Sequence, residues 1–151
     1  MAPYAIRRLE LADANHVAHV LRASFDDRLP WLSGLHTAEE DRQFVREHLF
    51  GQCEIWGALS PDLVGFVAFC PGWVDQLYVL PGRQGEGIGS ALLSIAKDAE
   101  AELRLWTFQR NVQARQFYEA RGFVAIDQTD GRDNEEREPD VLYRWARGAG
   151  P

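Results

Sequence analysis

Cysteine is scarce in this sequence, with only Cys53 and Cys70 among 151 residues. Both lie in apolar runs that are typical of strands, so we expect two buried thiols. A disulfide-bonded scaffold needs more cysteines, and a zinc cluster needs further ligands beside them. His16 and His19 share one face of a predicted helix, but no carboxylate or cysteine completes a ligand set there. The sequence therefore predicts no metal site.

Basic residues and long apolar runs are also scarce. Lysine and arginine total 16 against 23 aspartates and glutamates, which gives a net charge of −7. Nucleic-acid binding draws on clustered positive charge, so we expect no nucleic-acid partner. No segment approaches the ~20 apolar residues of a membrane-spanning helix, and the charged residues 1–20 do not resemble a signal peptide. These absences predict a cytoplasmic protein with no membrane partner.

The remaining composition is that of a globular domain. Hydrophobic residues make up 46% of the chain and charged residues 26%. Domains usually contain about 100–200 residues, and neither an internal repeat nor a linker divides this chain. We therefore expect a single domain over residues 1–148, which is compatible with either a monomer or a homodimer.

Hydrophobic periodicity and turn residues predict both helices and strands. We expect strands at residues 4–9, 53–59, 63–70, 73–80, 103–108, 123–127 and 141–145, and helices at 11–25, 38–50, 88–102 and 111–121. A capping box of Thr37 and Glu40 begins the second helix, after a loop at residues 26–36. Short turns around Pro61 and Gly72 suit antiparallel hairpins, whereas the third helix implies a parallel crossover. The predicted fold is α/β, with a mostly antiparallel central sheet of six or seven strands flanked by four helices.

A glycine-rich turn precedes the third predicted helix, at residues 81–90. Its glycines permit positive φ angles and the close approach of a ligand. Backbone N–H groups at a helix start bind phosphates, so the turn predicts an anion site at residues 84–90. The dinucleotide motif GxGxxG fails at Ser90, where its third glycine would stand, and the Gly-Lys-Ser/Thr ending of a P-loop is missing.

The spacing Gln84-x-x-Gly87-x-Gly89 resembles the pyrophosphate loop of the GNAT superfamily of N-acetyltransferases. The strand end at residues 77–79 and the helical segment at 111–123 are also similar to that superfamily. The resemblance covers nearly the whole chain and implies the GNAT fold, with acetyl-CoA as cosubstrate. It implies that the cosubstrate is bound by Leu77, Tyr78, Val79, Gln84, Gly85, Glu86, Gly87, Ile88, Gly89, Ser90, Asn111 and Tyr118.

Acetyl transfer to an amine requires three chemical functions. A base must remove a proton from an alkylammonium whose pKa lies near ~10, a fixed donor must stabilise the tetrahedral oxyanion, and an acid helps the thiolate to leave. By resemblance, Tyr118 is the acid and the Val79 N–H is the oxyanion donor. Asp75 shares a strand face with Val79 and is the candidate base. Many members of the superfamily carry a glutamate where this chain has Trp73.

Each of these assignments has an alternative. Asn111 also has the position of a helix N-cap, Tyr118 can be a core aromatic residue, and Asp75 can be a solvated carboxylate at a sheet edge. A covalent route through Cys53 or Cys70 is disfavoured, because neither is expected near a histidine or a helix start that would lower its pKa. Loss of the usual glutamate leaves open a non-catalytic acyl-CoA-binding module, and a nucleotide-binding regulatory domain is a third alternative.

In the superfamily, the acceptor amine usually binds between the first interhelical loop and the connection of the last two strands. Residues 129–140 contain six acidic residues against two arginines, and residues 36–41 add further acids. An acidic mouth attracts protonated amines, so we expect a cationic small-molecule or peptidyl amine, although charge runs also form solvated faces. Candidate acceptor residues are Trp31, His36, Trp73, Trp106, Asn134, Glu135 and Glu136, whose tryptophans offer cation–π walls or core packing. The segments 105–111, 129–131 and 134–136 resemble a bacterial subgroup of the superfamily.

Overall fold

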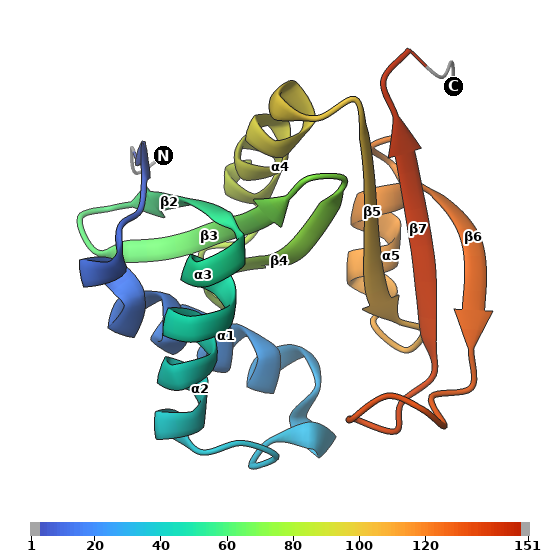
Figure 1. Cartoon of the computed structure of the whole chain (residues 1–151), viewed down its shortest axis with the longest axis horizontal. Coiled ribbons are helices and arrows are strands. Elements are labelled where there is room, and N and C mark those ends of the chain that lie inside the picture. Colours follow the sequence, from blue (N-terminus) through green and yellow to red (C-terminus); the bar gives the residue numbers. More distant parts are fainter. Residues whose placement is uncertain (1–3, 149–151) are drawn as a thin grey trace.

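A computed structural model describes residues 4–148 of the chain. The domain expected over residues 1–148 therefore includes residues 1–3, which lie outside the described residues. Seven strands of the described residues form one mixed, mostly antiparallel sheet in the order β1-β2-β3-β4-β5-β7-β6. Figure 1 labels β2 to β7 of this sheet. This arrangement confirms the predicted α/β fold. Among residues 4–148, no helix is both long and apolar enough to span a membrane.

The strands and helices follow the predicted order, with shifted ends. The strands are β1 (Ala5–Arg8), β2 (Glu54–Leu59), β3 (Leu63–Cys70), β4 (Trp73–Val79), β5 (Glu102–Phe108), β6 (Val124–Thr129) and β7 (Asp140–Ala146). The helices are α1 (Ala14–Arg28), α2 (Ala38–Phe44), α3 (Phe50–Gln52), α4 (Ile88–Ala99) and α5 (Val112–Glu119), with the short helical turns η1 (Leu11–Asp13) and η2 (Pro30–Leu32) and the π-helical η3 (Val45–Leu49).

Two stretches of the prediction are wrong in detail. The helix expected at residues 38–50 is interrupted by the π-helical η3, where the wider turn shifts the following side chains around the axis. The loop expected at residues 26–36 is shorter, because α1 continues to Arg28 and η2 follows. Thr37 does begin α2 as predicted, since its hydroxyl accepts from the Glu40 N–H at 3.1 Å.

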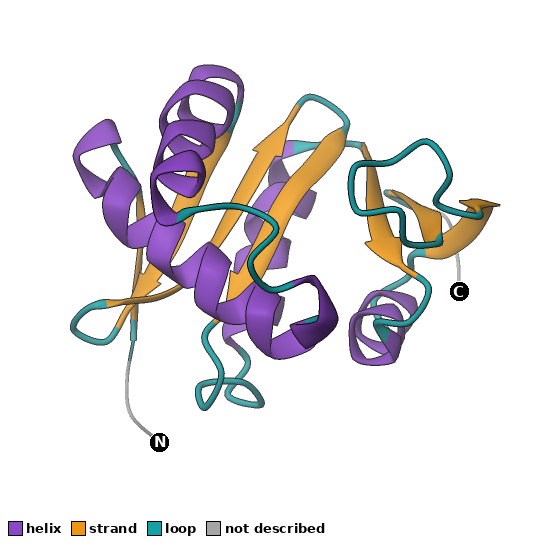
Figure 2. Ribbon diagram, turned by 90° about the horizontal axis from the view of Figure 1, so that it is seen from below, coloured by secondary structure: helices purple, strands orange, loops and turns teal. Residues whose placement is uncertain are grey.

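Apolar side chains are buried on both faces of the sheet. Phe66 of β3 belongs to a cluster with Val17 of α1 and Leu49 of η3, all fully buried. Val67, the next residue of β3, belongs to the other cluster, which includes Leu92 of α4. Successive strand residues point to opposite faces, so β3 lies at the centre of the fold with helices on either side of it (Figure 2).

The sheet divides between β4 and β5. These parallel strands are paired only at Trp73 and Arg104, and they then diverge, as Figure 1 shows. The pairing of β3 with β4 continues to Gly65 and Val79, and β5 remains paired with β7 along its length. Beyond the single parallel pair, the edge of β4 that faces β5 therefore has no strand partner among residues 4–148.

Helix α5 is held against the C-terminal half of the sheet by polar contacts. Arg115 Nε donates to the hydroxyl of Tyr143 at 3.0 Å, and that hydroxyl donates to Glu119 Oε2 at 2.6 Å. At its N-terminus, the Asn111 side chain accepts from the Ala114 N–H at 3.2 Å, so Asn111 is the N-cap. These contacts orient the helix that carries Tyr118.

Replacing Tyr143 with phenylalanine tests this anchoring. Tyr143→Phe removes both hydroxyl contacts while keeping the fully buried ring, so we expect the free energy of unfolding to fall by about 1–2 kcal/mol. Chemical denaturation followed by circular dichroism measures this loss. Tyr4→Phe is the matched control, with an expected change below about 0.5 kcal/mol. Equal stability of both variants would contradict the anchoring role of the hydroxyl.

Candidate active site

The open edge of β4 borders a groove with a volume of ≈ 260 Å³. Its walls come from β4, the turn that follows, the start of α4, and the helices α1 and α5. All of the residues expected to hold the cosubstrate line this groove except Glu86. The Glu86 carboxylate instead pairs with Arg83 Nε at 2.8 Å.

Backbone donors of β4 face this groove. The Leu80 N–H donates to the Val64 carbonyl of β3 at 2.8 Å. Successive residues of a strand direct their N–H groups to opposite edges, so the N–H groups of Leu77 and Val79 point to the edge that β5 has left. These peptide groups are available to an extended ligand, because no strand pairs with them there.

The glycine turn has the conformation that the sequence predicts. Gly82, Gly85 and Gly87 have φ angles of +87°, +83° and +82°, a region that side chains with a Cβ rarely adopt. Gly87 is the N-cap of α4, so the first N–H groups of that helix lie beside the turn. Free N–H groups and the helix dipole together favour a phosphate at this position.

The Gln84 side chain connects the turn to neighbouring elements. Its Nε2 donates to the Val79 carbonyl at 3.1 Å, and the same carbonyl accepts from Ser24 Oγ of α1 at 3.2 Å. Its Oε1 accepts from Arg28. Gln84 therefore positions the turn against β4 and α1, in addition to lining the groove.

Three arginines line the groove, namely Arg28, Arg83 and Arg121, of which Arg83 is already paired with Glu86. Burial lowers the pKa of Arg28 from its usual value, and Arg121 is stacked 3.8 Å from the centre of the Phe117 ring. Sequence analysis missed these side chains as ligand-binding candidates. Arg121 lies in the segment that resembles the superfamily, whereas Arg28 reaches the groove only through the packing of α1. With the N–H donors, these cations make the groove suitable for the phosphates of coenzyme A.

Tyr118 is positioned between two cavities, because it lines both the groove and a larger cavity next to it. The residue is only 8% exposed, and its ring is packed against Phe123 and Tyr143. Burial, and secondly the nearby Tyr78, raises the pKa of Tyr118. The hydroxyl accordingly keeps its proton at neutral pH and can act as a donor.

The second cavity has a volume of ≈ 690 Å³ and a predominantly acidic lining. The arginines among the described lining residues are Arg22 and Arg28, and Arg22 is already bound to Asp41 by two contacts of 2.8 Å. The carboxylates that line the cavity are Glu40, Asp41, Glu47, Asp75, Glu135, Glu136 and Asp140. The cavity therefore has a negative potential that favours a cationic ligand.

Asp75 is paired with a histidine inside this cavity. Its Oδ2 lies 3.0 Å from His48 Nε2, and its Oδ1 accepts from Gln76 Nε2 at 3.0 Å. The imidazole of His48 is stacked on Phe44 at 4.9 Å. A paired carboxylate and imidazole can accept a proton from a bound ammonium group. Sequence analysis missed His48, because the residue approaches Asp75 only through the packing of η3 against β4.

Side chains from two distant connections meet at the mouth of the cavity. His36 Nε2 lies 2.8 Å from Glu135 Oε1, which joins the segment before α2 to the β6–β7 connection. Trp31 Nε1 donates to Glu138 Oε1 at 2.7 Å, and the Arg110 guanidinium lies 3.9 Å above the Trp31 ring. The acidic β6–β7 connection therefore lies next to the cavity. Trp31 binds this connection through its contact with Glu138.

The candidate acceptor residues differ in their placement. His36, Trp106, Glu135 and Glu136 line the cavity, and Trp106 is 46% exposed. Three others lie outside its lining. Besides Trp31, these are Trp73, which is 37% exposed at the start of β4, and Asn134, whose side chain binds the backbone of Glu138 within the β6–β7 connection.

The cysteines differ from the prediction of buried strand residues. Cys53 precedes β2, Cys70 is the last residue of β3, and both are partly exposed. Burial, followed by the charge of Asp75, raises the pKa of Cys53 to about 12. Burial also raises the pKa of Cys70. Neither thiol is therefore an activated nucleophile at neutral pH.

A splayed mixed sheet with a phosphate-binding turn and a second cavity at its open edge is the architecture of an acyl-CoA-dependent N-acyltransferase. Residues 36–125, more than half of the chain, match the family model described as acetyltransferase (GNAT) domain. The chain therefore belongs to the GNAT superfamily of acetyl-CoA-dependent N-acetyltransferases.

Two curated bacterial relatives are named as N-acetyltransferases. The chain is 27% identical to the peptidyl-lysine N-acetyltransferase YjaB of Salmonella typhimurium over 130 residues, which cover 85% of this chain and 88% of YjaB. It is 35% identical to the peptidyl-lysine N-acetyltransferase YiaC of Escherichia coli over 66 residues. That second match covers 43% of this chain and 45% of YiaC.

Solved structures share the whole fold. The apo form of YjaB from Escherichia coli has a TM-score of 0.77 at 23% identity, covering 95% of this chain and 97% of that one. The PaiA N-acetyltransferase of Thermoplasma acidophilum, solved in complex with coenzyme A, has a TM-score of 0.72 at 23% identity, covering 95% and 99%. At this identity the likeness shows the fold alone.

A pair of glycine variants tests the turn as the site of acetyl-CoA binding. Gly87→Ala and Gly72→Ala both place a Cβ on a residue with a φ angle near +80°, and an added Cβ meets no atom within 4 Å at either position. We expect both to lower the free energy of unfolding by about 1–2 kcal/mol. Only Gly87→Ala should also weaken acetyl-CoA binding, by about tenfold, in isothermal titration calorimetry. Unchanged affinity in Gly87→Ala would show that the turn does not hold the cosubstrate.

Proposed function

We propose that this chain transfers the acetyl group of acetyl-CoA to a primary amine by direct attack in a ternary complex. The observation that carries this proposal is the junction of the groove and the acidic cavity, which share Leu77, Tyr78, Asn111 and Tyr118. Acetyl-CoA in the groove and an amine in the acidic cavity can thus meet beside these shared residues. All of these groups come from one chain, so the proposed reaction needs no residue from a partner subunit. We propose the cytoplasm as the compartment of the reaction.

Each step of the transfer has a candidate residue. Asp75, supported by His48, accepts a proton from the bound ammonium and frees its lone pair. The amine nitrogen then forms a bond to the acetyl carbon, and the Val79 N–H donates to the oxygen that becomes negative. When the bond between carbon and sulfur breaks, Tyr118 donates its proton to the departing thiolate. The nitrogen, which carries one surplus proton after the attack, releases it to solvent, and solvent also returns a proton to Tyr118 and removes the proton held by Asp75.

The acceptor that fits the second cavity best is a lysine side chain on a peptide. A lysine side chain is a cation at the end of a slender apolar stem, and the cavity combines carboxylates with apolar walls such as Phe44 and Trp106. Both YjaB and YiaC are named peptidyl-lysine N-acetyltransferases, which supports the same choice. Free polyamines are the competing cationic acceptors.

The role of Tyr118 is tested by removing its hydroxyl. Tyr118→Phe keeps the buried ring, so we expect acetyl-CoA to bind with unchanged affinity while kcat falls about 10²-fold or more. Tyr4→Phe is the control for the chemical change itself, and it should retain full turnover. If kcat of Tyr118→Phe equalled that of the unaltered chain, Tyr118 would have no part in proton transfer.

The role of the Asp75–His48 pair is tested in the same assay. Asp75→Asn preserves the shape of the side chain but removes its basicity, and we expect kcat to fall by about 10²–10⁴-fold. His48→Gln should produce a smaller fall, because Asp75 remains. Asp98→Asn, on the exposed side of α4, is the charge-matched control and should leave kcat unchanged. Full activity of Asp75→Asn would exclude it as the base.

A panel of amines distinguishes an enzyme from a binding module. Release of coenzyme thiol with a lysine peptide, beyond the rate without acceptor, supports the proposed reaction, and product mass spectrometry locates the acetyl group. Lys97 is the only lysine of the chain, and its Nζ donates to the Arg121 carbonyl at 2.6 Å, so self-acetylation contributes little background. Binding of acetyl-CoA without thiol release for any amine would instead support the non-catalytic module.

A further inference from the structure

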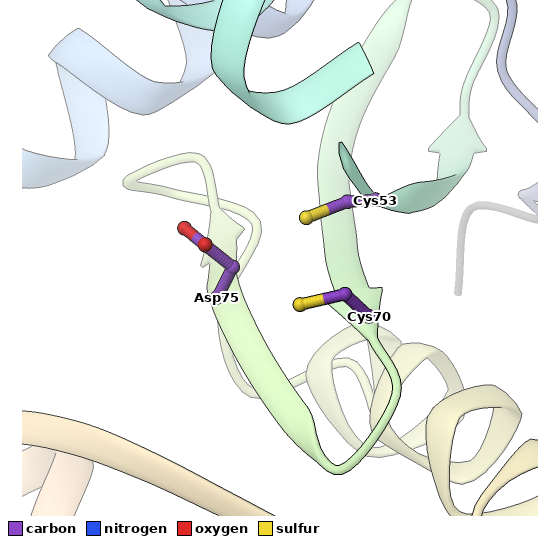
Figure 3. Close-up of side chains that lie close together, drawn as sticks. All are labelled: Cys53, Cys70 and Asp75. Carbon is purple, nitrogen blue, oxygen red and sulfur yellow. The ribbon is translucent and has the colours of Figure 1, made fainter. Parts of the chain in front are cut away.

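Two thiols converge on a carboxylate of the acidic cavity lining, that of Asp75. Glu54 is paired with Phe69 across β2 and β3, so Cys53 and Cys70 lie opposite each other at the next position. Both side chains extend toward the strand that carries Asp75, as Figure 3 shows. The two sulfur atoms and a carboxylate oxygen of Asp75 lie within 4.8 Å of one another.

We propose that Cys53, Cys70 and Asp75 bind one thiophilic divalent cation, with Zn²⁺ as the representative ion. Sequence analysis predicted no metal site, because the three residues are far apart along the chain and none belongs to a short-spaced ligand motif. The three ligands leave a fourth, tetrahedral position for water.

The geometry of the cluster suits such an ion. Three atoms within 4.8 Å of one another all lie within about 2.8 Å of a common point, whereas Zn²⁺ binds sulfur at about 2.3 Å and oxygen at about 2.0–2.2 Å. Small side-chain rotations therefore complete the coordination, without movement of the strands. Two sulfur ligands out of three select zinc, cadmium or cobalt over magnesium or calcium, which bind oxygen.

The electrostatics of the cluster also favour a cation. Burial is the main cause that raises the pKa of each thiol, and the negative charge of Asp75 raises the pKa of both as well, with Glu100 adding to the effect on Cys70. Conversion of both thiols to thiolates beside Asp75 would place three negative charges together. A dication compensates these charges, so binding releases two protons and strengthens as the pH rises.

His48 supports the same site from outside it. Its Nε2 contacts Asp75 Oδ2, and Gln76 Nε2 contacts the other oxygen of that carboxylate. Partners of this kind orient a carboxylate that binds a metal. Each carboxylate oxygen retains a second lone pair for the cation.

Metal binding at this site has a consequence for catalysis, which rests on the proposed function. A carboxylate bound to Zn²⁺ is a much weaker base, so Asp75 can no longer take a proton from the acceptor amine. The groove for acetyl-CoA lies apart from the cluster, and none of the three ligands lines it. Zinc should therefore lower kcat and leave the affinity for acetyl-CoA unchanged.

The metal site is tested with Co²⁺ as a spectroscopic probe on the reduced full chain. We expect one equivalent to bind, with thiolate-to-cobalt charge-transfer absorption that Zn²⁺ displaces. The absorption should vanish in the Cys53→Ser/Cys70→Ser double variant and require at least tenfold more cobalt in Asp75→Asn. A His16→Gln/His19→Gln variant removes the exposed histidine pair of α1 and should bind cobalt like the unaltered chain. Circular dichroism verifies that each variant is folded.

A second measurement uses the unaltered chain alone. One equivalent of Zn²⁺ should protect both cysteines from alkylation in mass spectrometry, and a chelator should reverse the protection. Absence of thiolate absorption at stoichiometric cobalt, or cobalt binding that persists in the double cysteine variant, would overturn the proposal.

These experiments distinguish a failure of the metal-binding proposal from a failure of the proposed acetyl transfer. Cobalt binding is observed without any acetyl transfer, so a chain that binds the metal but acetylates no amine contradicts only the proposed function. Zinc inhibition is followed by mass spectrometry of the acetylated peptide. Inhibition should be at least tenfold at saturating zinc in the unaltered chain and absent in the double cysteine variant. Equal inhibition in both would overturn the link between the cluster and Asp75.

Discussion

A single parallel residue pair, Trp73 with Arg104, joins the two halves of the sheet, and the site depends on the fact that the pairing stops there. Backbone N–H groups in a folded protein need partners, and the divergence of β5 leaves those of Leu77 and Val79 facing a groove. The glycine turn and the start of α4 supply further donors to that groove, and α5 places Tyr118 where the groove meets the acidic cavity. The same divergence leaves room for the acidic cavity. The groove and the cavity therefore both arise because the pairing of β4 with β5 ends after one residue pair.

The parts of the molecule that sequence patterns predicted are those determined locally. Periodicity located the helices and strands, because one apolar face of each must be buried. The spacing of Gln84, Gly87 and Gly89 located the turn, because positive φ angles and a following helix start are properties of a short segment. The Thr37 capping box and the N-cap position of Asn111 belong to the same category, since each satisfies N–H groups within one helical turn.

The parts that sequence patterns missed depend on contacts between distant elements. His48 meets Asp75 across 27 positions, and Arg28 reaches Gln84 across 56. Neither pair has a spacing that a motif could reveal, because the contacts depend on how α1 and η3 pack on the sheet. The π-helical turn at η3 adds to the difficulty, since it changes the face on which the following side chains lie. Asp75 was therefore predictable as a candidate base, whereas its partner His48 was not.

Beyond Trp73, β4 has the unpaired peptide groups of an edge strand, although it lies in the middle of the sheet. Edge strands with free peptide groups can pair with strands of other proteins, which leads to aggregation unless something blocks them. Here the groove along the edge measures ≈ 260 Å³, and its lining includes Ser24 of α1 and Phe117 of α5. A slender ligand chain fits this space, whereas a β-strand with side chains on both faces does not. The two helices thus keep foreign strands away from this edge of β4, while its unpaired peptide groups remain open to a slender ligand.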